Sequence, residues 1–345
     1  MNLSNYRTGV QSLDLQIVEL LKELPSEDAD LIAELLVSGV RLSLEDVNRG
    51  ELKLTNSALK ELRHSFSVFA PYRSERKATL FGSARISAGD PAYVSAREFG
   101  AAMAQKGWMV MTGAGPGIMA AGLEGAGKER SFGINIKLPF ESSANEFIAD
   151  DPKLINFKYF FTRKVIFMKE THGYALLPGG FGTMDEAFEL LTLMQTGKSP
   201  LTPVVLLDPP GSTYWDRWID FVRLELLDGG LISENDLSLM HVYKDPEAAA
   251  DHLCHFYSTY HSMRYAKDRL IIRLNRAVSD NELASLNLSF SDLLLSGSIE
   301  RISPDQSEVK DSDFLGLDRI AFRYNQSSQS RLRLLIDSLN DYAIK

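Results

Sequence analysis

Short apolar runs alternate with amphipathic stretches through the middle of the chain. The apolar runs lie at residues 78–81, 108–111, 132–136, 174–177 and 204–207, and helical spacing marks residues 93–105 and 186–195. This alternation predicts a parallel sheet covered by helices on both faces. We therefore expect an α/β fold, with a doubly wound, Rossmann-like parallel sheet, over residues 76–260.

The flanking segments have different patterns. Residues 1–75 carry apolar side chains at helical spacing and predict a helical N-terminal region. Residues 261–345 predict a small α+β C-terminal unit with strands at 270–274, 298–302 and 320–324. A capping-box pattern, Ser279 with Glu282, predicts the start of a helix there. The sequence does not decide whether this unit binds an effector, mediates dimerisation or covers the core.

Composition and charge narrow the class of protein. The chain has 345 residues, 44% of them hydrophobic, and a formal net charge of −9. Nucleic-acid backbones are bound through many Lys and Arg contacts, so we expect no nucleic-acid partner. No window approaches the roughly 20 apolar residues of a membrane span, and the N-terminus lacks a secretory pattern. The single cysteine, Cys254, excludes an intrachain disulfide. Together these features favour a cytoplasmic protein with no membrane partner.

Glycine-rich turns follow three of the expected strands, and we name them by their first residues: the 82 turn (82–85), the 112 turn (112–117) and the 178 turn (178–183). Ligands of parallel sheets bind beyond the carboxyl ends of the strands. Glycine lets a backbone approach a ligand closely, and a helix start presents unpaired N–H groups, so the turns predict a phosphate site. The residues concerned are Gly82, Ser83, Arg85, Thr112, Gly113, Gly115, Gly117, Gly179, Gly180, Gly182 and Thr183.

The 112 turn indicates a mononucleotide ligand. The spacing of Gly113, Gly115 and Gly117 is one residue shorter than GxGxxG, and no acidic residue follows the strand at 132–136. Both departures disfavour an oxidoreductase that binds a nicotinamide or flavin dinucleotide. The sequence also contains no Walker, HExxH, CxxC or GxSxG pattern, so we expect neither a metal nor a cofactor.

Glu186 has two interpretations that the residues alone leave open. Thr183 and Glu186 match a capping box, in which the glutamate only bonds back to the start of its own helix. Alternatively, Glu186 lies beside the 178 turn and away from the apolar stripe of its helix, where it can serve a bound nucleotide. Asp185 and Glu189 are nearby alternatives. The expected stripe consists of Ala187, Phe188, Leu191 and Met194.

Arg163 and Lys164 precede another helical pattern. If that helix starts near Thr162, the two cations lie in its first turn and oppose the helix dipole, so a bound anion or Glu186 would compensate them. If the helix starts earlier, near Asn156, both cations lie on a solvated face.

At these residues the chain resembles the Lonely Guy (LOG) family, the cytokinin riboside 5′-monophosphate phosphoribohydrolases and related bacterial nucleotide-monophosphate nucleosidases. The family signature PGGxGTxxE is matched in full by residues 178–186, and its Arg-Lys pair followed by methionine is matched by Arg163, Lys164 and Met168. Residues 112–119, which end at Met119, match the glycine-rich segment, and residues 82–85 match the first turn. Members are often labelled lysine decarboxylases, but no context here supports a pyridoxal lysine. The long flanks resemble a larger bacterial subgroup.

The resemblance implies an N-glycosyl hydrolase in which Glu186 and Arg163 are the catalytic pair. Its substrates would be nucleoside 5′-monophosphates of purine or cytokinin type, and its products the free base and ribose 5-phosphate. Met119, Lys164 and the glycine-rich turns would hold the substrate without a cofactor. The resemblance also implies a homodimer or larger homo-oligomer. The alternative is a regulatory protein that binds a mononucleotide without turnover.

Overall fold

The computed structural model describes residues 6–24, 27–137 and 144–342. The chain forms two compact units, Met1–His64 and Ser65–Lys345, and the division falls within helix α3 (Arg49–Phe69). Within the described ranges, none of the helices has the length and apolar character needed to cross a membrane.

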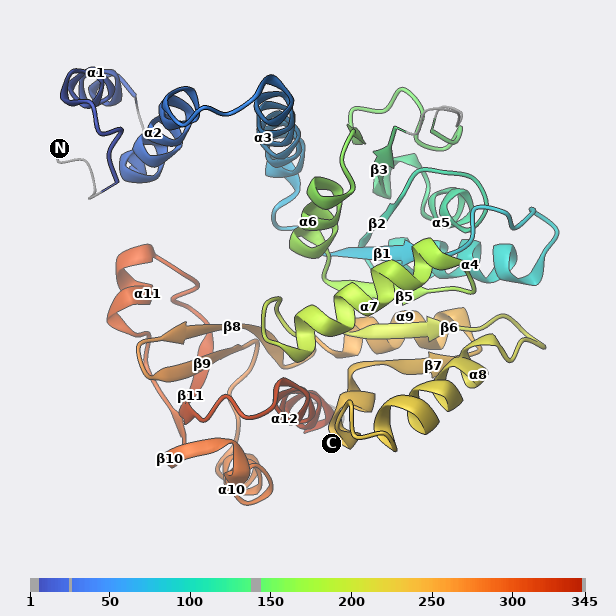
Figure 1. Cartoon of the computed structure of the whole chain (residues 1–345). Helices are drawn as coiled ribbons and strands as arrows, with labels where there is room; N and C mark the ends of the chain where they lie inside the picture. Colours follow the sequence, from blue (N-terminus) through green and yellow to red (C-terminus); the bar gives the residue numbers. More distant parts are fainter. Residues whose placement is uncertain (1–5, 25–26, 138–143, 343–345) are drawn as a thin grey trace. The chain divides into compact units, whose positions relative to one another are not determined.

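The second unit contains a sheet of seven strands in the order β4-β3-β2-β1-β5-β6-β7 (Figure 1). Every neighbouring pair is parallel. Because the order changes direction between β1 and β5, this is a Rossmann-like sheet with one additional edge strand. The strands are β1 (Lys77–Phe81), β2 (Met109–Thr112), β3 (Ser131–Ile136), β4 (Leu154–Phe157), β5 (Gly173–Leu176), β6 (Val204–Leu207) and β7 (His241–Tyr243).

Helices cover both faces of this sheet (Figure 1). They are α4 (Pro91–Gln105), α5 (Ile118–Ala126), α6 (Phe160–Glu170), α7 (Phe181–Gln195), α8 (Tyr214–Phe221) and α9 (Pro246–His255). Ala78 and Leu80 of β1 belong to one buried cluster with α4, α5 and α9. Phe81 points to the other face, where its ring lies 4.9 Å from that of Phe167 in α6. Alternate side chains of one strand thus reach opposite helix layers, which explains the continuous apolar runs.

A second, antiparallel sheet with the order β10-β11-β9-β8 follows in the same unit. Its elements are β8 (Tyr260–Ala266), β9 (Arg269–Leu274), α10 (Asp280–Ser289), β10 (Leu294–Arg301), α11 (Gln306–Asp311), β11 (Asp318–Tyr324) and α12 (Gln329–Asp341). Glu308 of α11 is fully buried and accepts hydrogen bonds from Arg273 in β9, at 2.7 Å, and Arg319 in β11, at 3.0 Å. These ion pairs connect α11 to two strands of the sheet.

The first unit contains α1 (Gln11–Lys22), α2 (Ala29–Leu44) and most of α3. Ile17 and Leu21 of α1 pack with Ala33 and Val37 of α2 in a small apolar cluster. Short helical turns elsewhere in the chain occupy Ala70–Tyr72, Lys128–Arg130, Val222–Leu227, Glu234–Leu239 and Ser291–Leu293.

The α/β class and the Rossmann-like sheet are confirmed, and each of the five strands expected in residues 76–260 lies within one residue of its predicted bounds. The capping box at Ser279 is also confirmed. The sequence pattern does not predict β4, β7 or β8. β4 and β7 are edge strands of 4 and 3 residues, too short to show a period, and most of β8 is only partly buried. The three-part division of the chain remains a prediction.

Candidate active site

A cavity of about 790 Å³ opens beyond the carboxyl ends of β1 and β5, and we call it the first cavity. The strand order changes direction at this point, where doubly wound sheets bind their ligands. Residues 81–85, Met119, Phe160, Arg163 and residues 179–186 line it. It therefore brings the 82 turn and the 178 turn together with both residues that the resemblance implies are catalytic.

Backbone hydrogen bonds hold the three glycine-rich turns together. The amide of Ser83 donates to the carbonyl of Pro178 at 3.2 Å, and the amide of Ile118 donates to the carbonyl of Ser83 at 3.1 Å. Gly117 has a φ of +68°, and a Cβ there would lie 2.9 Å from the carbonyl oxygen of Ala84. Glycine is required at residue 117 because both the conformation and the close approach exclude a side chain.

The 178 turn leads directly into α7. The helix begins at Phe181 after Gly180, which forms no side-chain cap, so N–H groups of the first helical turn remain open to a ligand. Thr183 in this turn is buried at the cavity wall. The hydroxyl of Tyr214 in α8 donates to the carbonyl of Gly179 at 2.6 Å and fixes the turn from behind. The geometry is suited to an anion.

Glu186 lies in α7 at the wall of the first cavity, and its side chain is nearly inaccessible, with 6% of its surface exposed. Among the described residues, its Oε2 has no hydrogen-bond partner. Burial raises the pKa of this carboxyl to about 7, against the opposing charges of Lys164 and Arg163. Glu186 can therefore exchange a proton near neutral pH.

The capping interpretation of Glu186 is wrong. The helix begins at Phe181, so Gly180 is the N-cap residue, and Thr183 and Glu186 are too far along α7 to form a capping box. The expected apolar stripe is also wrong in part, since Phe188 is exposed and Leu191 is only partly buried. The buried side of α7 consists of Thr183, Glu186, Ala187, Leu190 and Met194, so the expectation that Glu186 lies away from the apolar side of its helix is wrong.

Arg163 lies near the start of α6 and is buried between the strands and the 112 turn. Its Nε donates to the carbonyl of Ile134 in β3 at 2.8 Å. A Cβ at Gly113 would collide with its guanidinium, so glycine at this position makes room for the arginine. Burial lowers the pKa of Arg163, and the charge of Glu186 opposes this shift. Arg163 and Glu186 line one cavity, but these two side chains form no direct ion pair.

Lys164 is committed to two other carboxylates. Its Nζ lies 2.9 Å from Asp185 and 2.6 Å from Glu189, both on α7. The single charge of Lys164 therefore offsets part of the charge of Asp185 and Glu189, whereas Glu186 forms no ion pair among the described residues. The helix carrying these cations begins at Phe160 and Asn156 belongs to β4, so the expectation of a solvated face is wrong.

The 112 turn mostly lies beneath the first cavity. Thr112 is fully buried, and its hydroxyl accepts a hydrogen bond from the amide of Ala114 at 3.1 Å. Asn145 donates to the carbonyl of Gly115 at 2.9 Å. Among the described residues that follow β2, Met119 lines the cavity. The wall lies over the residues of the 112 turn, which do not line it themselves: Thr112, Gly113, Gly115 and Gly117. Their proposed contacts with a substrate remain predictions.

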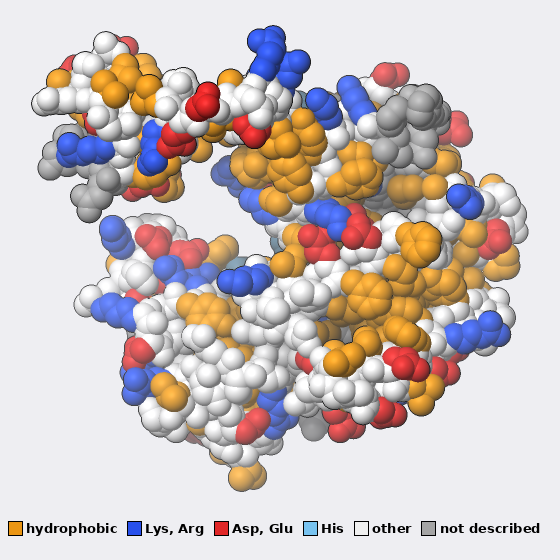
Figure 2. Space-filling model, viewed as in Figure 1, with side chains coloured by type: hydrophobic (Ala, Val, Ile, Leu, Met, Phe, Trp, Pro, Cys, Tyr) orange, Lys and Arg blue, Asp and Glu red, His pale blue; other side chains and the backbone are white. Residues whose placement is uncertain are grey.

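Aromatic side chains at the first cavity were not predicted as site residues. Phe160 and Phe181 line it with exposed rings, and Phe181 is 97% exposed. Figure 2 shows hydrophobic side chains gathered over α6 and along α7. The phenylalanine within PGGFGT is the one signal in the sequence for this feature, because an apolar residue in a polar turn is unusual.

Comparisons with known proteins relate the chain to one protein family. The model of the family described as "Possible lysine decarboxylase" matches residues 111–253. The chain is 32% identical over 143 residues to a protein of Mycobacterium tuberculosis named cytokinin riboside 5′-monophosphate phosphoribohydrolase, and the match covers 40% of this chain and 72% of that protein. The 178 turn and Arg163 lie within the segment matched by the family model.

The chain also resembles several solved structures at low sequence identity. One is the molybdenum cofactor carrier protein of Chlamydomonas reinhardtii, at 22% identity and a TM-score of 0.37, covering 52% of this chain and 98% of that one. Another is the molybdenum cofactor binding protein of Rippkaea orientalis, at 20% identity and a TM-score of 0.34, covering 51% and 94%. The strand order and the flanking helices define an α/β protein with a Rossmann-like parallel sheet. The chain belongs to the LOG family.

Proposed function

We propose that this protein hydrolyses the N-glycosidic bond of nucleoside 5′-monophosphates. The observation that carries the proposal is the buried carboxylate of Glu186, which has a pKa of about 7 and an oxygen without a hydrogen-bond partner among the described residues. It lies in the same cavity as a glycine-rich helix start. The name of the Mycobacterium tuberculosis relative supports the same reaction class.

The 5′-phosphate is held by the 178 turn in this proposal. N–H groups of the first turn of α7 and the hydroxyl of Thr183 donate to the phosphate oxygens. This contact lies away from the bond that breaks, so its binding energy positions C1′ and the contact persists through the reaction. The rings of Phe160 and Phe181 offer flat apolar surfaces for the base, purine or cytokinin type.

Glu186 acts on the attacking water. As the bond between C1′ and the base nitrogen breaks, positive charge develops at C1′, and a carboxylate beside it stabilises that charge. Water adds to C1′ and gives its proton to Glu186, while the departing base takes up a proton. The products are the free base and ribose 5-phosphate. Arg163 orients the ribose or its phosphate through planar N–H donors.

A product assay tests the proposal directly. Purified protein is incubated separately with AMP, GMP, CMP, UMP and isopentenyl-AMP, and free base is separated by chromatography. Base release by the wild-type protein should fall by roughly 100-fold or more in Glu186→Gln. Glu98→Gln is a matched control, since Glu98 is an exposed carboxylate on α4 outside the first cavity.

Two results would contradict hydrolysis by Glu186. Base release that is undiminished in Glu186→Gln would exclude the proposed role of the carboxylate. Saturable binding of a mononucleotide without any base release would favour the regulatory alternative. The preferred base and the cytoplasmic location remain predictions.

A further inference from the structure

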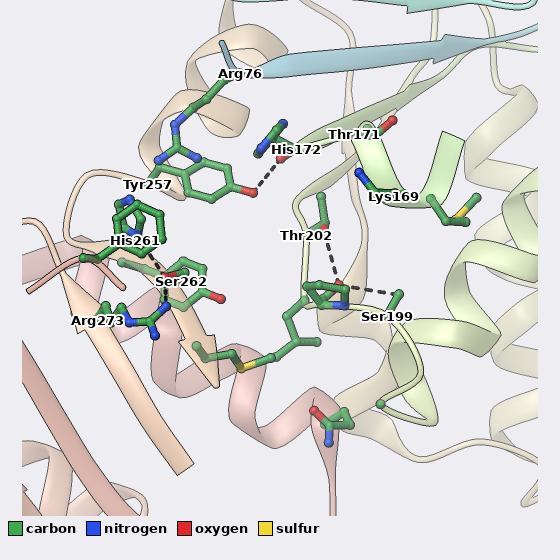
Figure 3. Close-up of a pocket in the computed structure, with 18 of the residues that line it drawn as sticks. Arg76, Lys169, Thr171, His172, Ser199, Thr202, Tyr257, His261, Ser262 and Arg273 are labelled. Atoms are coloured by element: carbon green, nitrogen blue, oxygen red, sulfur yellow. Dashed lines mark hydrogen bonds between the residues drawn. The ribbon is translucent and has the colours of Figure 1, made fainter. Parts of the chain in front are cut away.

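A second cavity of about 830 Å³ lies at the amino ends of the parallel strands, opposite to the first cavity (Figure 3). Arg76 and His172 line it immediately before β1 and β5, and Thr202 lines it before β6. The antiparallel sheet supplies the other wall through His261 and Arg273. The cavity is therefore built jointly by the amino ends of the parallel strands and the C-terminal sheet.

The lining of the second cavity is strongly basic, although the whole chain is acidic. It includes Arg73, Arg76, Lys169, Lys198 and Arg273, and none of its described lining residues is Asp or Glu. The chain carries a net charge of −9. A concentration of positive charge in a concave site attracts anions.

Some of these cations are already neutralised. Arg273 lies 2.7 Å from Glu308 and 2.5 Å from Asp313, and Lys169 lies 2.5 Å from Glu170. The carboxylates of these ion pairs, Glu308, Asp313 and Glu170, do not line the cavity themselves. Arg273 and Lys169 therefore shape the wall more than they attract a ligand.

Arg76 has no such partner. Its guanidinium stacks over the ring of Tyr257, with 3.7 Å between the guanidinium carbon and the ring centroid. Within the described part of the chain, its side chain makes neither a hydrogen bond nor an ion pair. Burial lowers the pKa of this half-buried arginine, which means that its charge is incompletely solvated. An anion in the second cavity would supply the missing partner.

Further donors lie around Arg76. The imidazole of His172 accepts a hydrogen bond at Nδ1 from the amide of Lys77, at 3.2 Å, so its neutral form carries a proton on Nε2. The hydroxyl of Ser262 lies 2.8 Å from His261. Arg73 and Lys198 are exposed and, among the described residues, also lack a carboxylate partner.

We infer that the second cavity binds a small metabolite with a multiply charged phosphate group, held by Arg76 with Arg73 and Lys198. Three unpaired cations match a phosphate or pyrophosphate better than a single carboxylate, because each can neutralise a separate charge. Arg76 is pre-positioned by its stacking on Tyr257, which lowers the entropy lost on binding.

Two helices connect this site with the first cavity. α6 carries Arg163 at the first cavity and Lys169 at the second. α7 carries Glu186 at the first cavity, and the segment after its end, residues 197–202, lines the second. A ligand in the second cavity would contact segments that belong to or follow both helices, and we expect it to change the Michaelis constant for the nucleotide. This effect on turnover rests on the proposed function, whereas binding itself does not.

Calorimetric titration of the full chain tests the site. The probes are inorganic phosphate, pyrophosphate and citrate, the last as a multiply charged carboxylate. Wild-type protein should bind pyrophosphate saturably, and Arg76→Gln should weaken that binding about tenfold or more. Arg223→Gln is the matched control, because Arg223 is exposed in the turn after α8 and lies outside the second cavity.

A second variant covers the case in which Arg76→Gln does not fold. Arg73→Gln combined with Lys198→Gln changes only exposed side chains and should also weaken pyrophosphate binding, with an unchanged thermal midpoint. Wild-type affinity in both variants would overturn the site, as would the lack of saturable binding in the wild type. Citrate binding as tight as pyrophosphate would overturn the phosphate assignment. Pyrophosphate binding by a protein that releases no base would contradict the proposed function alone.

Discussion

The chemistry of the first cavity depends on an uneven distribution of counter-charges. Three carboxylates, Asp185, Glu186 and Glu189, lie close together on α7, and Lys164 pairs with the outer two. Glu186 is left buried, with an oxygen that has no described partner. Its protonation is therefore governed mainly by burial, as is common for groups that transfer protons near neutral pH.

The pKa of Glu186 predicts how activity depends on pH. The carboxyl titrates at about 7, and only its ionised form can accept a proton from water. We expect kcat/KM for nucleotide hydrolysis to rise with pH up to about pH 7 and then level off. Residual activity of Glu186→Gln should lack this step. A step in the wild-type profile near the ordinary glutamate pKa would contradict the assignment.

The same shift predicts an effect on stability. The pKa of Glu186 is raised on folding from 4.5 to about 7, so the folded state holds the proton more tightly. The stabilising contribution of the protonated form is complete below the unfolded pKa and is lost as pH rises through the folded pKa.

Glu186→Gln should therefore raise the free energy of unfolding by roughly 1–3 kcal/mol at about pH 8 and by much less at about pH 5. Urea denaturation at both values measures the difference, and Glu98→Gln is the control. A stabilisation that is equal at the two values would show that the charge of Glu186 is not its cause.

At the residue scale, the sequence motif located Glu186 but could not distinguish a capping role from a place in the cavity. The decision depends on where α7 begins. Thr183 has the side chain of an N-cap residue, yet the helix begins at Phe181, after Gly180. The motif also located Arg163, but the local sequence does not show that its side chain is held by the carbonyl of Ile134, 29 residues earlier in the chain.

At the scale of elements, the first cavity depends on glycine-rich turns that pack against one another. Gly117 and Gly127 flank α5, and both have positive φ, +68° and +75°. A Cβ at Gly117 would meet the backbone of Ser83 and Ala84, whereas a Cβ at Gly127 would meet open space. Comparing alanine substitutions at the two positions therefore distinguishes the cost of backbone strain from the cost of steric collision.

We expect Gly117→Ala to lower the free energy of unfolding by about 2 kcal/mol more than Gly127→Ala, which experiences only the backbone strain of its positive φ, about 1–3 kcal/mol. Gly117→Ala should also reduce base release, because it displaces the 82 turn. Chemical denaturation and the product assay measure both effects. Equal losses of stability in the two variants would argue against close packing of the turns.

The buried ion pairs of the C-terminal sheet support another prediction. Glu308→Gln leaves Arg273 and Arg319 without their shared counter-charge in the interior, and we expect a loss of roughly 3–5 kcal/mol of folding free energy. Asp311→Asn is the control, since Asp311 pairs with Arg264 near the surface and should cost less than about 1 kcal/mol. Thermal unfolding compares them. Similar midpoints for the two variants would contradict a central role of Glu308.

Element prediction succeeded where burial imposes a period over several residues. β1, β2, β3, β5 and β6 are covered on both faces, and their apolar runs are visible in the sequence. β7 has three residues, all partly exposed, and carries no such period. α11 begins with a local capping box of Asp305 and Glu308. Its attachment to the sheet depends instead on the pairing of Glu308 with Arg273 and Arg319, contacts that no local pattern shows.

At the scale of the whole molecule, exposed hydrophobic side chains gather on α6 and α7 (Figure 2). They include Phe160, Phe161, Val165, Phe181 and Phe188. Exposed apolar patches on a protein are commonly covered by a partner. The homo-oligomer implied by the family resemblance would account for this surface.

We expect light scattering coupled to gel filtration to give a mass of at least two chains. Phe161→Ser should shift the protein towards the monomer, because it places a polar group in the apolar surface. Leu288→Ser is the control, since Leu288 is 83% exposed on α10, outside that surface. A monomeric wild-type protein would contradict this use of the surface.

The hydroxyl of Tyr214 has a consequence for transplanting the signature. It supports the carbonyl of Gly179 from 35 residues further along the chain, so residues 178–186 do not hold their shape through local bonds alone. If that nonapeptide were grafted onto another scaffold, it would lose the hydrogen bond from Tyr214. Such a graft would need another hydroxyl donor to the carbonyl of Gly179 to keep the anion-binding shape of the turn.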